Sequence, residues 1–270
     1  MVSEIIKHNQ VLNQDCIEGM KLISENTIDL VITDPPFAID FKAKKANYNR
    51  LESRVLEGYK EIPQKDYYNF TYRWMSQCFR ILKESGSMYV FSGWNNLRDI
   101  LNVIEEVGFT MVNHIIWKYQ FGVVTNRKYV TSHYHCLLIC KNDKKRKFFP
   151  YERFGKNEKN EQGRSLHYKD KEDVWEIKRE YWTGMEKTPT KLPKEIIKKI
   201  IQYSSEKGDV VFDPFMGSGQ TAVVSKMEKR EYLGFEIVKE YHDFITKRLD
   251  SGSYLIKKSN ETDDPLVKWA

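Results

Sequence analysis

Short apolar runs, each about as long as a buried strand, alternate along the chain with segments whose apolar residues recur every three or four positions. The apolar runs predict strands at residues 11–14, 29–34, 85–93, 110–118, 135–141, 209–213 and 232–237. The amphipathic segments predict helices at residues 16–27, 66–82, 95–108, 191–208, 218–229 and 239–249. Strands that alternate with helices are typical of an α/β protein with a doubly wound, mostly parallel sheet.

Residues 142–182 interrupt this alternation, because they are rich in charged residues, Tyr and Trp and have no sustained apolar periodicity. We therefore predict one α/β domain that is assembled from residues 1–141 and 183–250, with residues 142–182 as an insert. Residues 38–65 are polar and basic, which is typical of a loop. Residues 251–270 are predicted to form a loose tail.

The composition narrows the class of protein. The 270 residues include 44 Lys and Arg against 38 Asp and Glu, and the resulting net charge of +6 favours an anionic partner without requiring one. No stretch approaches the roughly 18 consecutive apolar residues of a membrane span, and the first residues lack the apolar core of a secretory signal. The cysteines form no C-x-x-C pair, which argues against a disulfide framework. We expect a cytoplasmic protein without a membrane segment.

One short segment contains several residue types that bind metals, namely His133, His135, Cys136 and Cys140. Side chains alternate between the two faces of a strand, so the histidines and the cysteines would point in opposite directions. We therefore expect no metal site.

Residues 210–221, VVFDPFMGSGQT, combine an apolar strand that ends in Asp213 with a glycine-containing turn and the start of a helix. In a parallel sheet this arrangement brings a ligand to the carboxyl ends of the strands. Gly217 and Gly219 would let the backbone approach that ligand closely, although a tight strand-to-helix turn is the simpler interpretation of glycines alone. No Lys-Ser or Lys-Thr pair follows, as a phosphate-binding loop requires. Glu236 ends the next predicted strand, where an acid can accept hydrogen bonds from both hydroxyl groups of a ribose.

The segment DPPF, residues 34–37, follows a predicted strand and so belongs to the same edge of the sheet. Pro35 and Pro36 have no backbone N–H, which leaves carbonyl groups without a local partner beside the carboxylate of Asp34. Phe37 adds a flat apolar face. Two acceptors and a stacking face suit a planar group that bears an NH2, such as the exocyclic amine of adenine or cytosine. The alternative is a simple turn after a strand.

Together, DPPF and FMGSG resemble the signature pair of the S-adenosylmethionine-dependent DNA amino-methyltransferases, [DNS]-P-P-[YF] and F-x-G-x-G. The catalytic motif precedes the cofactor loop here, which is the circularly permuted order of the family's beta class. The resemblance covers residues 11–118, 131–141 and 188–249. It implies a Rossmann-like methyltransferase fold in which residues 142–182 recognise the DNA target.

The same resemblance implies which residues hold S-adenosylmethionine. They are Asp15 and Cys16 at the adenine, Asp213, Phe215, Gly217, Ser218 and Gly219 at the methionine and ribose portions, and Glu236 at the ribose. The family's H-P-T-Q-K-P segment corresponds to TPTKLP at residues 188–193, where Leu192 replaces the family's lysine. Thr190 and Lys191 are the candidates from this segment. Either Lys191 takes the place of that lysine at the cofactor carboxylate, or the pocket binds more weakly.

For the substrate, the resemblance implies duplex DNA with the target base flipped out of the helix. Phe37 would stack on the base, while Asp34 and the Pro35 carbonyl would accept hydrogen bonds from its amine. In this family an initial Asp goes mostly with adenine, so adenine N6 is the predicted methylation site and cytosine N4 the alternative. The candidates for contact with DNA are Lys42, Lys44, Lys45, Arg127, Lys128, Lys145 and Arg146.

Two other functions stay open at this point. An RNA methyltransferase is one, because Asn-Pro-Pro-Tyr relatives modify RNA and protein amines. A DNA-binding protein that kept the fold and lost catalysis is the other, and TPTKLP is the hint for it. A cognate restriction endonuclease would be a natural partner of an active enzyme, and both a monomer and a homodimer are compatible with the chain.

Overall fold

The protein's structure is a computed structural model that describes residues 6–38, 62–119, 126–180 and 191–252. The predicted DNA contacts Lys42, Lys44 and Lys45, the cofactor candidate Thr190 and nearly all of the predicted tail lie outside the described residues.

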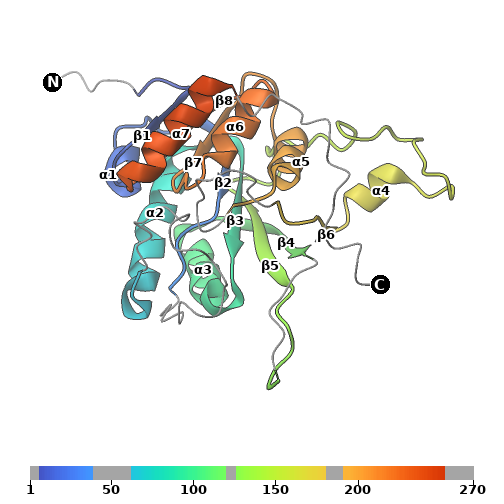
Figure 1. Cartoon of the computed structure of the whole chain (residues 1–270), viewed down its shortest axis with the longest axis horizontal. Helices are drawn as coiled ribbons and strands as arrows, with labels where there is room; N and C mark the ends of the chain where they lie inside the picture. Colours follow the sequence, from blue (N-terminus) through green and yellow to red (C-terminus); the bar gives the residue numbers. More distant parts are fainter. Residues whose placement is uncertain (1–5, 39–61, 120–125, 181–190, 253–270) are drawn as a thin grey trace.

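A single sheet of eight strands organises the described residues (Figure 1). In chain order the strands are β1 (Gln10–Leu12), β2 (Ile28–Thr33), β3 (Leu82–Ser92), β4 (Thr110–Lys118), β5 (His133–Cys140), β6 (Val174–Glu176), β7 (Val210–Asp213) and β8 (Glu231–Phe235). Their order across the sheet is β1-β8-β7-β2-β3-β5-β4-β6. Only β5 among these strands runs antiparallel to its neighbours β3 and β4. The predicted doubly wound, mostly parallel sheet is therefore confirmed.

Helices cover both faces of the sheet (Figure 1). They are α1 (Cys16–Met20), α2 (Tyr67–Ile81), α3 (Trp94–Val107), α4 (Leu166–Asp170), α5 (Lys194–Ser204), α6 (Gln220–Met227) and α7 (Lys239–Ser251), together with a short 3-10 turn at Gln64–Asp66. The apolar sides of α1, α2 and α3 pack into one buried cluster, and α5 packs into a second cluster on the opposite face. Removing these apolar faces from water is what holds the layers together.

The predicted helix over residues 95–108 shows how local chemistry sets an element boundary. In the structure, α3 ends where Gly108 adopts the left-handed conformation, with φ of 92°, and its N–H donates to Glu105 O at 3.1 Å. Glycine has no Cβ to oppose this conformation, so it ends a helix at little cost.

The predicted insert is partly built into the sheet. Residues 174–176 form β6, which pairs in parallel with β4 and makes the edge of the sheet. Phe149 N donates to Tyr203 O at 2.8 Å, and the hydroxyl of Tyr203, in α5, donates to Asp170 Oδ2 at 2.6 Å. These contacts tie residues 149–176 to α5, and the domain boundaries themselves stay a prediction.

The directions of the strands decide which loops meet. Because β2, β3, β4, β7 and β8 all run the same way, their carboxyl ends lie at one edge of the sheet. Residues 126–132, which lead into β5 at this edge, project from the body of the molecule (Figure 1). The segment after β5 starts at the opposite edge, because β5 is reversed.

Candidate active site

A cavity of about 260 Å³ lies at the carboxyl edge of the sheet, over the ends of β2, β7 and β8. It brings together the two sequence motifs, because Asp34, Pro35, Pro36 and Phe37 line it together with residues 213–218. Asp15, Cys16, Lys191 and Glu236 line it as well. These residues are therefore neighbours in space, as the rule for ligands at the carboxyl ends of parallel strands requires, whereas the predicted Gly219 is not among the described residues that line the cavity.

The loop after β7 is held in shape by the carboxylate of Asp213. Asp213 Oδ1 accepts a hydrogen bond from Phe215 N at 3.0 Å, and Oδ2 accepts one from Thr221 Oγ1 at 2.8 Å. The first bond closes the turn and the second ties it to the first turn of α6. Asp213 is 5% exposed, so this carboxylate is a structural anchor as well as a wall of the cavity.

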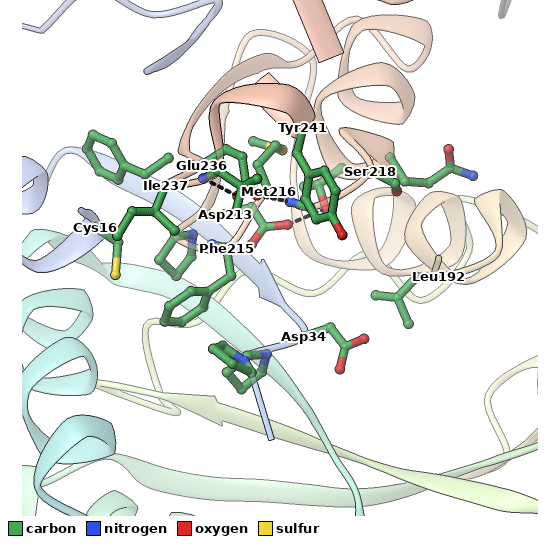
Figure 2. Close-up of a pocket in the computed structure, with 18 of the residues that line it drawn as sticks. Cys16, Asp34, Leu192, Asp213, Phe215, Met216, Ser218, Glu236, Ile237 and Tyr241 are labelled. Carbon is green, nitrogen blue, oxygen red and sulfur yellow. Dashed lines mark hydrogen bonds between the residues drawn. The ribbon is translucent and has the colours of Figure 1, made fainter. Parts of the chain in front are cut away.

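Glu236 occupies the place after β8 that the sequence predicted for a ribose acceptor. Its Oε2 accepts a hydrogen bond from Gly217 N at 2.8 Å, and its Oε1 accepts one from Val238 N at 2.9 Å (Figure 2). These two backbone donors aim the carboxylate and link it to the glycine loop. Each oxygen keeps a second lone pair, so the group can still accept hydrogen bonds from a ligand in the cavity.

The turn at Gly219 has no room for a larger residue, and we expect Gly219→Ala to destabilise the protein. Gly219 has φ of 72°, and a Cβ there would lie 2.8 Å from Ile245 Cγ2 in α7. Strain and steric clash together should lower the free energy of unfolding by about 2–4 kcal/mol.

Gly217→Ala is the matched control. Gly217 also has positive φ, of 52°, but the nearest atom to an added Cβ is Phe215 O at 3.7 Å. It should cost only the conformational strain, about 1–2 kcal/mol. Thermal unfolding of both variants measures the difference. An equal loss in the free energy of unfolding would show that the clash with Ile245 does not destabilise the protein.

Asp34 presents an unused acceptor to the cavity. It directly follows β2, and Figure 2 shows its carboxyl group on the side of the cavity where Leu192 lies. Its Oδ1 is buried and has no hydrogen-bond partner among the described residues. A buried acceptor without a partner costs free energy that a donor from a ligand would recover.

Phe37 places an aromatic ring next to this acceptor. It lines the cavity, is 8% exposed, and stacks on Tyr134 of β5 with a centroid distance of 6.0 Å and an interplanar angle of 21°. Near-parallel aromatic rings at this separation attract each other. The ring is therefore held in a defined plane.

Three carboxyl groups around the cavity resist ionisation. Burial, together with the negative charge of Asp213, raises the pKa of Asp34 to about 7. Burial likewise raises the pKa of Asp213 to about 6 and that of Glu236 to about 7. When they are ionised, these carboxylates repel one another in a site of low dielectric constant. A ligand that carries positive charge would offset this repulsion, so the cavity suits such a ligand.

Lys191 reaches the cavity but already has an acidic partner. Its Nζ lies 2.6 Å from Glu180 Oε1, and its side chain is only 6% exposed. Glu180 Oε2 also accepts hydrogen bonds from Lys194 N at 2.8 Å and from Gln220 Nε2 at 3.0 Å. The guanidinium of Arg248, in α7, bonds to the Gln220 side chain and donates to Ser218 O. These contacts connect Lys191 to the glycine loop.

Several lining residues were missed by the sequence analysis. Gln14 lines the cavity beside Asp15, and its buried Nε2 has no hydrogen-bond partner among the described residues. Tyr241 of α7 extends its ring over the loop that holds Ser218 (Figure 2). Gln14 borders a predicted site residue and could have been found from that adjacency, whereas nothing in the pattern of α7 indicates that the buried Tyr241 also lines the cavity.

Asp15 has a structural task that the sequence did not predict. Its Oδ1 caps α1 by accepting hydrogen bonds from Ile17 N at 2.9 Å and from Glu18 N at 3.1 Å. The adjacent Cys16 is buried, and burial raises the pKa of its thiol far above the usual range. Both residues line the cavity, and their contact with an adenine ring stays a prediction.

The predicted DNA contacts fall at two different edges of the sheet. Arg127 and Lys128 are exposed in the β4–β5 connection, which leaves from the edge that carries Asp34. Lys145 and Arg146 follow the reversed strand β5 at the opposite edge, where they pair with Glu84 at 3.6 Å and Asp143 at 3.1 Å, respectively. The contact of Lys145 and Arg146 with DNA stays a prediction, and their position at the edge away from the cavity argues against it.

The histidine and cysteine segment forms no metal centre in the part of the chain that the structure describes. His114 Nε2 and His135 Nδ1 lie 2.8 Å apart and share a hydrogen bond across β4 and β5. Burial, with the neighbouring His114 and His133, lowers the pKa of His135 to about 4.

No helix among the described residues is long and apolar enough to cross a membrane.

The cavity, the two motifs and the strand order together indicate one class of protein. Comparison of the chain with sequence models of known families identifies that class. The sequence model of the family described as DNA methylase matches residues 28–248. This range contains both motifs and seven of the eight strands. The chain belongs to the DNA methylase family.

Individual relatives agree with this assignment. The type II methyltransferase M.HinfI of Haemophilus influenzae is 32% identical over 256 residues, which span 89% of this chain and 68% of the relative. The DNA adenine methyltransferase YhdJ of Escherichia coli (strain K12) is 29% identical over 258 residues, 90% of this chain and 83% of the relative. A solved structure titled as the M1.HpyAVI-SAM complex has a TM-score of 0.63 at 25% identity and covers 89% of this chain and 98% of that one.

Proposed function

We propose that the protein is an S-adenosylmethionine-dependent methyltransferase that acts on the exocyclic N6 amine of adenine in double-stranded DNA. The observation that carries this proposal is the unused acceptor of Asp34, buried in the same cavity as the acids Asp213 and Glu236. An acceptor without a partner suits an amine donor from the substrate, and the acids suit a ribose and a sulfonium.

The residues around the cavity fit the cofactor. Gly217 has φ of 52°, and the nearest atom to an added Cβ would be Phe215 O at 3.7 Å, so the backbone there is not covered by a side chain and can approach a ligand. Glu236 would accept hydrogen bonds from the ribose, and the three carboxyl groups would stabilise positive charge. Lys191 would attract the cofactor's carboxylate, in competition with Glu180. When bound, the cofactor supplies a methyl group on a positively charged sulfur.

Asp34 and Phe37 would orient the target base. An exocyclic amine is a poor nucleophile because its lone pair is delocalised into the ring, and hydrogen bonds to Asp34 and the Pro35 carbonyl would favour a tetrahedral nitrogen. Phe37 would hold the ring plane by stacking. Since the pKa of Asp34 is about 7, its carboxylate is also a base of suitable strength for the proton that the amine loses.

A base inside a duplex cannot reach Asp34, so the target must be flipped into the cavity. The exposed Arg127 and Lys128 would contact phosphates on the same side of the molecule. Adenine is proposed because of the DPPF motif and because one relative is named a DNA adenine methyltransferase. A partner restriction endonuclease is proposed from the type II relative. The protein would act in the cytoplasm.

Because acids line the cavity, we expect the affinity for S-adenosylmethionine to fall as the pH is lowered through 7. A bound sulfonium lowers the pKa of nearby carboxyl groups, so binding releases protons at pH 6 and favours the ionised site. Isothermal titration calorimetry at pH 6.0 and 8.5 measures this, and buffers with different ionisation enthalpies report the protons released. An affinity that is independent of pH would contradict the placement of the cofactor beside Asp34, Asp213 and Glu236.

Transfer of a labelled methyl group tests the class of substrate. Protein, S-adenosylmethionine labelled in its methyl group and either unmethylated duplex DNA, bulk RNA or a mixture of proteins are incubated in parallel. We expect the label in DNA alone. Label in RNA would replace the proposed substrate, and cofactor binding without transfer to any of them would support the binding-only alternative.

A further inference from the structure

The residues after β6 contact the catalytic aromatic ring through a chain of side chains. We call residues 177–180 the strap. Ile177 O accepts a hydrogen bond from Trp117 Nε1 at 2.8 Å. The guanidinium of Arg179 lies 4.0 Å from the ring centroid of Tyr119 and 6.0 Å from that of Tyr134. A guanidinium over an aromatic face is attracted by the ring's quadrupole.

The rings beneath Arg179 lead directly to Phe37. Trp117 and Tyr134 are stacked at 5.8 Å with an interplanar angle of 23°, and Tyr134 and Phe37 are stacked at 6.0 Å with an angle of 21°. Tyr119 packs on both Trp117, at 5.5 Å, and Tyr134, at 5.7 Å. The three rings of Trp117, Tyr134 and Phe37 are thus close to parallel, so a tilt of one ring disturbs the next.

Tyr134 contacts Phe37 but is not part of the cavity wall. Among the described residues that line the cavity, Phe37 is present and Tyr134 is not. Phe37 therefore contacts both the cavity and Tyr134. Tyr134 would set the plane of the ring without touching the substrate.

The strap is anchored on its other side by Glu180. This carboxylate holds Lys191 Nζ at 2.6 Å, Lys194 N at 2.8 Å and Gln220 Nε2 at 3.0 Å. Arg179 and Glu180 are neighbours in the chain, so these contacts hold the backbone next to Arg179 against Lys191, α5 and α6. The guanidinium itself is held by its contacts with the rings of Tyr119 and Tyr134.

We propose that Arg179 and Tyr134 are positioning residues for methyl transfer, which hold Phe37 in the plane that the flipped base requires. This inference rests on the proposed function. It adds a role for the end of the predicted insert, because the strap joins edge strand β6 to the ring that stacks on the base. Methyl transfer depends steeply on the orientation of the target amine, so a loss of ring alignment should reduce the rate of the bound complex.

Steady-state kinetics with unmethylated DNA test the proposal. Arg179→Ala and Tyr134→Leu should each lower kcat roughly tenfold at saturating DNA and cofactor, with an unchanged Kd for S-adenosylmethionine. Tyr134→Phe keeps the ring and should retain most of the wild-type kcat. Arg179→Lys keeps the charge but loses the planar group, so it should restore kcat only in part.

Lys178→Ala is the matched control for charge, since it removes a neighbouring cation of the strap. If Arg179 merely binds phosphate, both alanine variants would raise KM for DNA equally, Arg179→Lys would restore it, and kcat would not change; that result would overturn the proposal. An unchanged kcat in Arg179→Ala and Tyr134→Leu would overturn it too, as would an equal weakening of cofactor binding. Thermal unfolding checks that each variant is folded. Failure of the proposed function itself is distinguishable, because the wild-type protein would then transfer no methyl group to DNA.

Discussion

Asp34→Ala should lower the rate of methyl transfer to DNA by roughly 10²–10³-fold, the usual cost of removing one oriented polar group from a catalytic site. The substitution removes the only cavity-facing carboxylate oxygen that is buried and lacks a partner among the described residues. Cofactor binding should survive, because the contacts of Glu236 with Gly217 and Val238 are untouched. Single-turnover transfer of a labelled methyl group measures the loss.

Asp34→Asn is the matched control, because it keeps one acceptor oxygen at nearly the same place. We expect a smaller loss than in Asp34→Ala, consistent with the Asn that the family motif allows at this position. If both variants transferred methyl groups at the wild-type rate, Asp34 would not be the acceptor of the target amine.

Asp34→Ala should make the folded protein more stable although it lowers the rate of methyl transfer. The pKa of Asp34 is about 7 in the folded protein, far above the ordinary value for an aspartate, so its ionisation disfavours the folded state as the pH rises from 4 to 7. Asp34→Ala should therefore raise the free energy of unfolding at pH 8 by about 1–3 kcal/mol, and this gain should disappear near pH 4. Such an exchange of stability for activity is expected of a catalytic group.

Glu236→Ala should weaken the binding of S-adenosylmethionine by about 10²–10³-fold, since it removes charge-assisted hydrogen bonds to the ribose. It also leaves Gly217 N and Val238 N without the acceptor that they now share. The glycine loop therefore loses its link to the end of β8. Calorimetric titration with the cofactor measures the change.

Glu236→Gln separates the two contributions. The amide keeps one acceptor oxygen and cannot accept from both Gly217 and Val238, so an intermediate loss of about tenfold is expected. Binding of DNA without cofactor should match the wild type in both variants, which shows that they are folded. Cofactor affinity unaffected by Glu236→Ala would place the ribose elsewhere.

The meeting of the two motifs was predictable from a general property of parallel sheets. Asp213 ends strand β7, while Asp34 and Glu236 directly follow strands β2 and β8. Because these strands are parallel, all three acids lie at the same edge of the sheet. The end of α3 at Gly108 was likewise readable from the local pattern.

The direction of β5 could not be read in this way. A buried apolar run looks the same whichever way the strand points, so the sequence did not reveal that β5 is antiparallel to β3. That reversal places Lys145 and Arg146 away from the cavity edge and Tyr134 beside Phe37. The three-residue strand β6 was too short to give a periodic signal.

The contacts of Lys191 were also beyond the sequence pattern. The motif comparison indicated that a lysine had moved by one position, but its partner Glu180 lies in a segment without periodicity. The pairing of Lys191 with Glu180 depends on how Glu180 packs against α5 and α6, which is tertiary information.

Identification of the methylated base tests the central claim most directly. Unmethylated duplex DNA is incubated with the protein and S-adenosylmethionine, digested to nucleosides and analysed by mass spectrometry, with Asp34→Ala in parallel. We predict N6-methyladenine with the wild-type protein and little or none with the variant. N4-methylcytosine would contradict the choice of base, and DNA without either modified nucleoside would contradict the proposed function.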